Sequence, residues 1–442
     1  MRTTTLCLAL AALIGPGCDD ADDGGGGGGG QDAGASSSLN LTVDAPTAAL
    51  AGQTIDVPFV IATPDGPAAG LQVEGEIEFG GGTAEAGLSD AEGRGVIRWT
   101  LGPSPVSQSL RVHVGPAQQT ITLLAGQADP VPTSARFGDV PGWLMAEGVG
   151  GTTEDLAFTP EGLVLGVQGG LIRLDAEGAI ERMALTGEAL ERPLGIARDL
   201  DGNLWIADGG RNALMKVAPD GTVSEALVDD GEQPLAGPNY VAVGPDGKVY
   251  LSDPCLARLI RFDPATGQVD ATLLFDEATE GGPNGFAFRG DTLWIVTENT
   301  VLTCGHAGVA AVDAPVAGLF RVPVSDAGFG ARETVAEALG VFGDGLALDE
   351  AGNVYVILDQ VANLQLAESA VWVLPTGETS LRKVLVADGV LYANLAFGQG
   401  AFGPEQLYIS LLSVPPFAGA ASRGVERAPV GFAGWPLLLE VP

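Results

Sequence analysis

A short pattern recurs six times between residues 127 and 442, and it restricts the possible folds more than any other feature of the sequence. Each copy opens with one residue of variable chemistry and continues with small and apolar residues. Successive copies begin 40, 45, 45, 60 and 49 residues apart, at Glu154, Leu194, Asn239, Asn284, Asp344 and Ala393. In most copies a turn and two further apolar runs follow, as in the hairpin around Asp201-Gly202. Repeats of about 40 to 50 residues with four short strands each are typical of propeller blades. The pattern therefore predicts an all-β fold, with a six-bladed β-propeller over residues 127–442.

Residues 39–126 have a different pattern, in which short runs of alternating apolar residues are separated by turn-forming residues. Runs of this kind at a spacing of about 8 to 12 residues predict a β-sandwich. The segment Asp90–Trp99 resembles the late hairpin of bacterial Ig-like domains of the invasin type. The resemblance implies an N-terminal Ig-like β-sandwich, to which we assign the role of a spacer. We expect its one histidine, His113, to be a surface strand residue rather than a ligand.

The first 38 residues have the composition of an export signal followed by a linker. Arg2 precedes an apolar run far shorter than the roughly 20 residues that span a membrane, and small residues follow, so we predict a signal peptide over residues 1–18. Cys18 resembles the acylated first residue of a bacterial lipoprotein. Residues 19–38 contain seven consecutive glycines and predict a flexible tether. We expect an extracytoplasmic protein, held at the cell envelope by a lipid on Cys18 or, alternatively, secreted.

The charge balance excludes some classes of partner and of metal site. The chain has 56 acidic and 21 basic side chains, which gives a formal net charge of −35. A nucleic-acid partner is not expected, because binding phosphates requires a basic face. The two histidines of the chain leave little scope for a histidine-rich metal centre. A metal site in this protein would therefore be built from oxygen ligands.

The first residues of the six repeats predict such a site, because in a closed propeller they project toward one mouth of the central channel. Four of these residues carry side-chain oxygens, namely Glu154, Asn239, Asn284 and Asp344. Two carboxylates and two amide oxygens suit a hard divalent cation that binds six to eight oxygens, with water completing the set. Alternatively, Asn284 and Asp344 are ordinary turn residues, since glycine follows each. Glu154 fits this alternative poorly, because glutamate is a poor turn former.

In their order and spacing, these motifs resemble the senescence-marker-protein, gluconolactonase and luciferin-regenerating-enzyme family. The resemblance covers roughly residues 140–442 and rests on Glu154, Pro238-Asn239, Pro283-Asn284-Gly285, Asp344–Ala347 and Ala393–Gly398. It implies hydrolysis of lactones or phosphoesters at calcium or another divalent cation. The implied ligands are Glu154, Asn239, Asn284 and Asp344. Asp344 would also act as a general base or nucleophile.

Four further residues are candidates for the same face of the propeller. The resemblance implies an arginine that orients the substrate, for which Arg198 is the candidate. His306 lies in a loop on this face, where it either faces the substrate or is exposed to solvent. Cys255 and Cys304 follow the second strands of adjacent repeats in an exported chain, so we predict a disulfide between them. Two free thiols are the alternative.

Together these observations predict an exported, calcium-dependent hydrolase of the gluconolactonase type. Its partner would be a small-molecule lactone or related ester, membrane contact would come only from the lipid anchor, and the protein would be a monomer. The alternative is a non-catalytic surface propeller that binds a sugar or protein and contains a structural metal. A propeller similar to strictosidine synthase is a third possibility, which would not need the oxygen ring.

Overall fold

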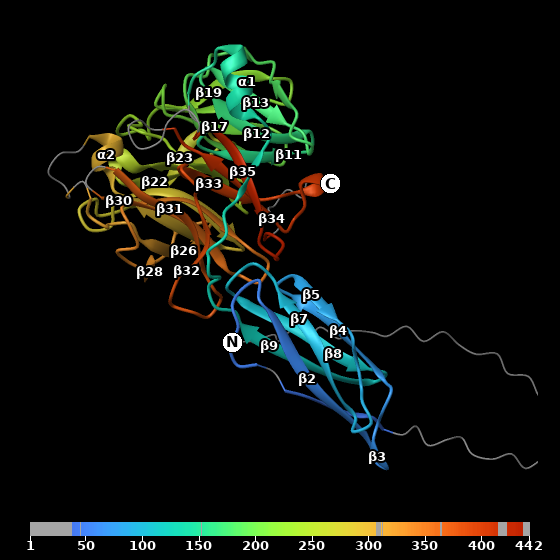
Figure 1. The fold of residues 1–442 in the computed structure, drawn as a ribbon. Coiled ribbons are helices and arrows are strands. Elements are labelled where there is room, and N and C mark those ends of the chain that lie inside the picture. The colour runs from blue at the N-terminus through green and yellow to red at the C-terminus, as the bar shows by residue number, and fades with distance from the viewer. Residues whose placement is uncertain are drawn as a thin grey trace, which may run out of the picture. The chain divides into compact units, whose positions relative to one another are not determined.

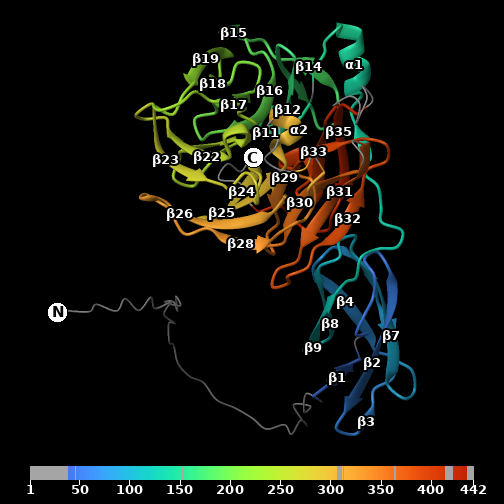
Figure 2. The same ribbon diagram turned by 90° about the vertical axis from the view of Figure 1, so that its left-hand side faces the viewer.

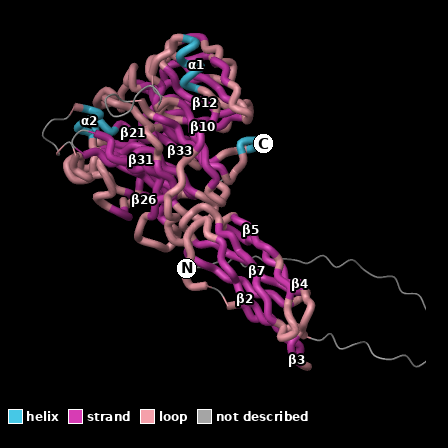
Figure 3. Tube along the Cα trace, in the orientation of Figure 1, coloured by secondary structure: helices cyan, strands magenta, loops and turns pink. Residues whose placement is uncertain are grey.

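The structure is a computed structural model that describes residues 38–44, 46–151, 153–305, 311, 313–362, 365–413 and 422–435. The chain divides into the units Met1–Ser38 and Leu39–Pro442. The predicted signal peptide, Cys18 and the tether up to residue 37 lie outside the described residues. Strands dominate the second unit, as Figure 3 shows, so the all-β prediction is confirmed. Within the described ranges, none of the helices has both the length and the apolar character needed to cross a membrane.

The N-terminal part of the second unit consists of two antiparallel sheets, drawn in blue to teal in Figure 1. One has the order β1-β2-β7-β5 with β3 beside β2, and the other has the order β6-β4-β8-β9. Their bounds are β1 Asn40–Val43, β2 Thr54–Thr63, β3 Gly66–Pro67, β4 Gln72–Phe79, β5 Gly82–Glu85, β6 Gly87–Leu88, β7 Arg94–Leu101, β8 Ser107–Val114 and β9 Ala117–Leu124. Alternate residues of β2 and β8, such as Val57 and Leu110, are buried in one hydrophobic core that both sheets share. His113 lies on β8, with its Nε2 3.9 Å from Oε2 of Glu74.

The remaining strands form a succession of mainly antiparallel sheets. Their orders are β10-β35-β34-β33, β11-β12-β13-β14, β15-β19-β18-β17-β16 and β20-β21-β22-β23, and a nine-stranded sheet has the path β27-β26-β25-β29-β30-β31-β32 with β24 beside β25 and β28 beside β26. The nine-stranded sheet contains two successive groups of strands, and among the described residues only the pair Glu298–Phe342 joins them.

The bounds of these strands are β10 Ala135–Phe137, β11 Leu156–Thr159, β12 Gly162–Val167, β13 Gly170–Leu174, β14 Ile180–Arg182, β15 Thr186–Gly187, β16 Pro193–Arg198, β17 Leu204–Asp208, β18 Ala213–Val217, β19 Thr222–Leu227, β20 Val241–Val243, β21 Val249–Asp253, β22 Arg258–Asp263, β23 Gln268–Leu274, β24 Gly282–Arg289, β25 Thr292–Glu298, β26 Leu319–Ser325, β27 Gly328–Phe329, β28 Glu333–Ala336, β29 Phe342–Leu348, β30 Val354–Ala362, β31 Gln365–Leu374, β32 Arg382–Val386, β33 Tyr392–Phe397, β34 Gln406–Leu411 and β35 Gly424–Pro429. The helical segments are α1 Val140–Glu147, η1 Pro254–Leu256, α2 Thr300–Cys304 and η2 Gly400–Phe402.

The inner strands of these sheets form a closed ring. The strands β11, β16, β20, β24, β29 and β33 contact one another in this order, and β33 contacts β11. Figure 2 shows the sheets arranged around a common centre. The strand β10, from the start of this region, pairs with β35 near the end of the chain. The last sheet is therefore built from both ends of this region, since strand pairing joins β10 to β35, and the closure leaves few exposed sheet edges.

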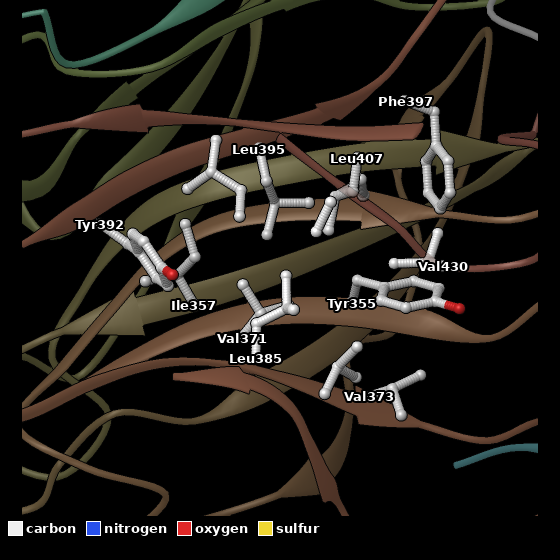
Figure 4. Close-up of a cluster of buried hydrophobic side chains, with 14 of the residues drawn as sticks. Tyr355, Ile357, Val371, Val373, Leu385, Tyr392, Leu395, Phe397, Leu407 and Val430 are labelled. Carbon is white, nitrogen blue, oxygen red and sulfur yellow. The ribbon is translucent and has the colours of Figure 1, made fainter. Parts of the chain in front are cut away.

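Apolar side chains between successive sheets provide the core of this region. In Figure 4, Tyr355 and Ile357 of β30 and Val371 of β31 lie opposite Leu395 of β33 and Leu407 of β34. All five side chains are buried. Burial on this scale stabilises the fold by roughly 25 cal/mol for each Å² of apolar surface removed from water. The sheets thus have both faces covered, and the polar residues described below gather where the inner strands begin.

Candidate metal and catalytic site

The four predicted ligands lie at the starts of four inner strands. Glu154 and Asn239 stand two residues before β11 and β20, and Asn284 and Asp344 are the third residues of β24 and β29. Nδ2 of Asn239 donates a hydrogen bond to Oε1 of Glu154 over 2.8 Å. The structure therefore brings together side chains that are 85 residues apart in the chain.

Glycines that follow the first residues of the repeats bring neighbouring inner strands into direct contact. A Cβ atom on Gly285 would lie 2.2 Å from the backbone oxygen of Asp344. A Cβ on Gly345 would lie 2.3 Å from Oδ1 of Asn394, and one on Gly195 would lie 2.6 Å from the backbone oxygen of Asn239. Any larger residue would push the strands apart at these points. Backbone contact therefore sets the lateral spacing of the side chains around the ring.

Three further carboxylates gather around the predicted ligands. Asp155 follows Glu154 directly, Glu298 ends β25, and Asp359 lies on β30. Glu298 and Asp359 both pair with Phe342, which lies between them on β29. Burial raises the pKa of each of these three carboxyl groups to about 8, and the negative charge of Glu154 adds to the rise at Glu298 and Asp155. Such shifts are typical of functional sites.

The two predicted acidic ligands are perturbed in the same direction. Burial raises the pKa of Asp344 well above its ordinary value, and repulsion from Glu154 and Asp359 raises it further. Burial also raises the pKa of Glu154, whereas the hydrogen bond from Asn239 and the positive charge of Arg192 oppose the rise. The negative charges of the neighbouring carboxylates therefore disfavour ionisation of Asp344.

The carboxylate cluster consists of the five acidic residues described above, namely Glu154, Asp155, Glu298, Asp344 and Asp359, and it has few compensating partners. None of its five carboxylates forms an ion pair with any residue that the structure describes. Asp344 is 9% exposed, and its carboxylate forms no hydrogen bond within the described ranges. Asp359 is 2% exposed, and its Oδ1 is buried without a hydrogen-bond partner among the described residues. Unpaired buried carboxylates are costly, so the cluster needs protons or a cation.

In two earlier repeats, the acid at the end of the second strand has hydrogen-bonding or ion-pair partners. Asp208 ends β17 and accepts hydrogen bonds from the backbone N–H groups of Glu191 and Arg192, over 2.7 and 2.9 Å. Asp253 ends β21 and pairs with Arg258 over 2.9 Å. These two acids hold loops in place. Asp359 and Glu298 occupy the equivalent strand position without an ion pair among the described residues.

The donor set at the ring fits a hard cation. In the described part of the chain, no three Asp, Glu, His or Cys side chains converge as a metal site. The predicted set has a different composition, with two carboxylates and two amide oxygens, and this mixture is one that calcium accepts. Zinc would need nitrogen or sulfur ligands, which the four residues do not provide.

The structure places Arg198 away from these residues. Arg198 is the last residue of β16 and pairs with Leu204 beside the hairpin turn. The opposite end of β16 is Pro193, which pairs with Asp208. The arginine at that end is Arg192, an exposed residue whose charge acts on Glu154. The repeat alignment does not indicate Arg192, because this residue precedes the repeated segment.

The last two groups of predicted residues lie near Glu298. A disulfide joins Cys255 of η1 to Cys304 of α2. Oγ1 of Thr303, the residue before Cys304, lies 3.4 Å from Oε1 of Glu298 and donates a hydrogen bond to it. The disulfide therefore holds α2 next to one carboxylate of the cluster. His306 lies outside the described residues.

Comparison with known proteins gives one partial similarity in sequence. No protein-family description matches the chain. A virginiamycin B lyase of Nocardia farcinica is 32% identical over 124 residues, which are 28% of this chain and 39% of the lyase. The similarity therefore spans about two fifths of the length of this curated relative.

Solved structures with a similar course of the chain include a gluconolactonase, a calcium-binding regucalcin and a virginiamycin B lyase. The gluconolactonase of Xanthomonas campestris has a TM-score of 0.45 at 17% identity and covers 68% of this chain and 97% of its own. The regucalcin of Agrobacterium tumefaciens has a TM-score of 0.49 at 18% identity, with 70% and 98% covered. The lyase of Staphylococcus aureus has a TM-score of 0.41 at 11% identity, with 66% and 88% covered. With scores below 0.5, these likenesses carry no argument about the activity of this chain.

Proposed function

We propose that the protein is a calcium-dependent hydrolase of the gluconolactonase type that acts on a small-molecule lactone or related ester. In this proposal residues 127–442 form a six-bladed propeller, residues 39–126 form an Ig-like spacer, and the chain is exported and tethered through Cys18. The closed ring of inner strands supports the propeller assignment, and the two N-terminal sheets support the Ig-like assignment.

One observation carries the functional proposal, namely that four buried carboxylates and the half-buried Glu154 gather beside two amides without any ion pair in the described part of the chain. Burying an unpaired carboxylate costs several kcal/mol, about as much stability as a protein loses when one partner of a buried ion pair is removed. A divalent cation would remove this penalty at Glu154 and Asp344. The two carboxylates would balance the charge of the cation, and Asn239 and Asn284 would add neutral oxygen ligands without adding charge.

The residues of the site can also support hydrolysis. A bound divalent cation supplies Lewis-acid polarisation of a substrate carbonyl oxygen. Asp344, which lacks a hydrogen-bond partner among the described residues, would accept a proton from the attacking water or attack the carbonyl carbon itself. Asn239 would hold the Glu154 carboxylate in place through their hydrogen bond.

The test is calorimetric titration of calcium chloride into the chelator-treated protein, together with hydrolysis assays on γ- and δ-lactones and phosphotriesters with and without chelator. Asp344→Asn should lower turnover at least 100-fold and weaken calcium binding. Asp349→Asn is the matched control, because Asp349 is a fully buried carboxylate at the other end of β29 that accepts hydrogen bonds from Asn353 and Tyr355. This control should keep both properties. Turnover that is insensitive to chelator, or unchanged calcium affinity in Asp344→Asn, would refute the proposal.

The same assays distinguish the proposed hydrolase from the alternative, a non-catalytic propeller. A non-catalytic propeller with a structural metal would bind calcium and gain thermal stability from it, yet hydrolyse none of the esters. Chelator-sensitive turnover in the wild-type protein eliminates that alternative.

A further inference from the structure

The segment that carries Glu154 lies at the junction between the first and last sheets. Its neighbours on one side are β33, β34 and β35, which the chain reaches only more than 200 residues later. The chain also enters the last sheet shortly before Glu154, through β10, and hydrogen bonds to β33, β34 and β35 then hold the Glu154 segment against this sheet.

All three residues from Thr153 to Asp155 are bonded across the junction. Oγ1 of Thr153 donates to the backbone oxygen of Leu411 over 2.7 Å and accepts from the backbone N–H of Gly424 over 2.6 Å. The backbone oxygen of Glu154 accepts a hydrogen bond from Oγ of Ser410 over 2.5 Å. Thr153 and Ser410 are both fully buried, so these bonds are shielded from water.

Asp155 makes the most connections of the three. Its Oδ1 accepts from the backbone N–H of Leu156 over 2.7 Å and also from Nδ2 of Asn394 on the last sheet. Its Oδ2 accepts from the backbone N–H of Ile196 on the second sheet, over 2.6 Å. One carboxylate thus joins the first sheet to both of its neighbours.

Asn394 completes the connection on the side of the last sheet. Its Oδ1 accepts from the backbone N–H of Leu395 over 2.7 Å, so the amide is oriented with its Nδ2 toward Asp155. Its backbone N–H donates to Oγ of Ser410 over 2.9 Å, and the same hydroxyl donates to Glu154. Asp155, Asn394 and Ser410 therefore form one continuous network around the backbone of Glu154.

We propose that Asp155 and Asn394 are positioning residues that fix the Glu154 carboxylate against Asn239 for cation binding. This inference rests on the proposed calcium site. Neither side chain forms a hydrogen bond with the Glu154 carboxylate. Asp155 follows Glu154 directly in the chain, and the backbone N–H of Asn394 is connected to the backbone oxygen of Glu154 through Oγ of Ser410. Groups that orient a metal ligand in this way change metal affinity by roughly 10- to 100-fold when they are replaced.

The test is a reciprocal exchange of the two side chains in the full-length protein. Asp155→Asn places two amide groups opposite each other, and Asn394→Asp places two carboxylates opposite each other, so each single variant should bind calcium at least tenfold more weakly than wild type. The double variant restores one donor and one acceptor and should recover most of the lost affinity. It should fall short of wild type, because the amide introduced in place of Asp155 has one oxygen where the carboxylate had two.

The readouts are the calcium dissociation constant by calorimetry and the Tm of the chelated protein. A purely structural role predicts that Asp155→Asn lowers the Tm as Asp349→Asn does while calcium affinity is retained at temperatures well below the Tm. That result would overturn the inference, as would a double variant no better than the two single variants. If Asp155→Asn does not fold, Ser410→Ala takes its place, since it removes only the hydroxyl that bonds to Glu154, and unchanged calcium affinity in this variant would equally overturn the inference. Failure of the proposed function is distinguishable, because then the wild-type protein itself binds no calcium.

Discussion

Asn239 donates its side-chain N–H to the carboxylate of Glu154, although the two residues stand at the starts of two inner strands that are not neighbours in the ring. The strand between them is β16, whose first repeat residue is the apolar Leu194. The hydrogen bond therefore bridges a position of the ring that offers no oxygen. This bridge makes Asn239 both a candidate ligand and the partner that orients Glu154.

Replacing Asn239 should weaken calcium binding more than loss of one neutral ligand would. Asn239→Ala removes the amide oxygen and the hydrogen bond to a carboxylate, and bonds to charged groups contribute about 1.5–3 kcal/mol. The expected loss of affinity is about 10- to 100-fold by calorimetry. Leu194→Ala is the control, since its side chain supplies no oxygen, and it should leave the affinity within about threefold of wild type. Equal losses in both variants would contradict the assignment of Asn239.

The stability of the chelated protein should fall as the pH rises from about 4 to about 8. Asp155, Glu298 and Asp359 have folded-state pKa values of about 8, whereas carboxyl groups in the unfolded chain titrate near 4. Between these values the folded protein binds more protons, so this contribution is complete below pH 4 and is lost as the pH passes 8. Denaturant unfolding between pH 4.5 and 8.5 measures the effect. Calcium should reduce the slope, and a flat profile without calcium would argue against the shifts.

Asp359→Asn should stabilise the chelated protein at pH 8. The substitution removes a buried carboxylate whose Oδ1 has no hydrogen-bond partner among the described residues, at almost unchanged side-chain volume. Relief of such a group is expected to be worth about 1–3 kcal/mol in the free energy of unfolding. Asp208→Asn is the matched control, and it should destabilise instead, because the Asp208 carboxylate accepts backbone hydrogen bonds. A loss of stability in Asp359→Asn would show that this Oδ1 has a partner in solution.

Gly285→Ala should damage both the fold and the site. The added methyl group would lie 2.2 Å from the backbone oxygen of Asp344, and relief of such overpacking by backbone shifts costs about 1–3 kcal/mol. Because the shift moves Asp344, calcium affinity should fall together with the Tm. Gly170→Ala is the control, as the nearest atom to its added carbon is a flexible Arg182 nitrogen at 3.6 Å. Equal effects of the two substitutions would rule out the close strand contact.

The repeat made the ring of first residues predictable, because each copy has the same register and the closed arrangement brings the copies to one place. The hydrogen bond between Glu154 and Asn239 agrees with this arrangement, and their role as ligands stays a prediction. Asp359 was harder to identify, since acids also end the second strands of other repeats. Only the loop conformation decides whether both oxygens of such an acid are occupied, as at Asp208, or whether one lacks a partner among the described residues, as at Asp359.

The junction between the first and last sheets was not predictable for a related reason. The alignment placed Ala393 at the ring position of the last repeat, but the polar group that reaches the first sheet belongs to Asn394. The pairing of Asp155 with Asn394 spans 239 residues, and nothing in the local pattern of either segment indicates it. The adjacent acids Glu154 and Asp155 were the available signal, because two neighbouring carboxylates before a buried strand need separate partners.

The close contacts at Gly195, Gly285 and Gly345 show that strand spacing and site chemistry depend on different residues in these repeats. The glycines determine how far apart the strands stand, and the residues just before them determine which chemical groups face the channel. At Leu194, Asn284 and Asp344 the chemical group therefore differs from repeat to repeat, while the glycine that follows keeps the neighbouring strands in close contact. In these three repeats, strand spacing and the chemistry of the site are thus assigned to separate, adjacent residues.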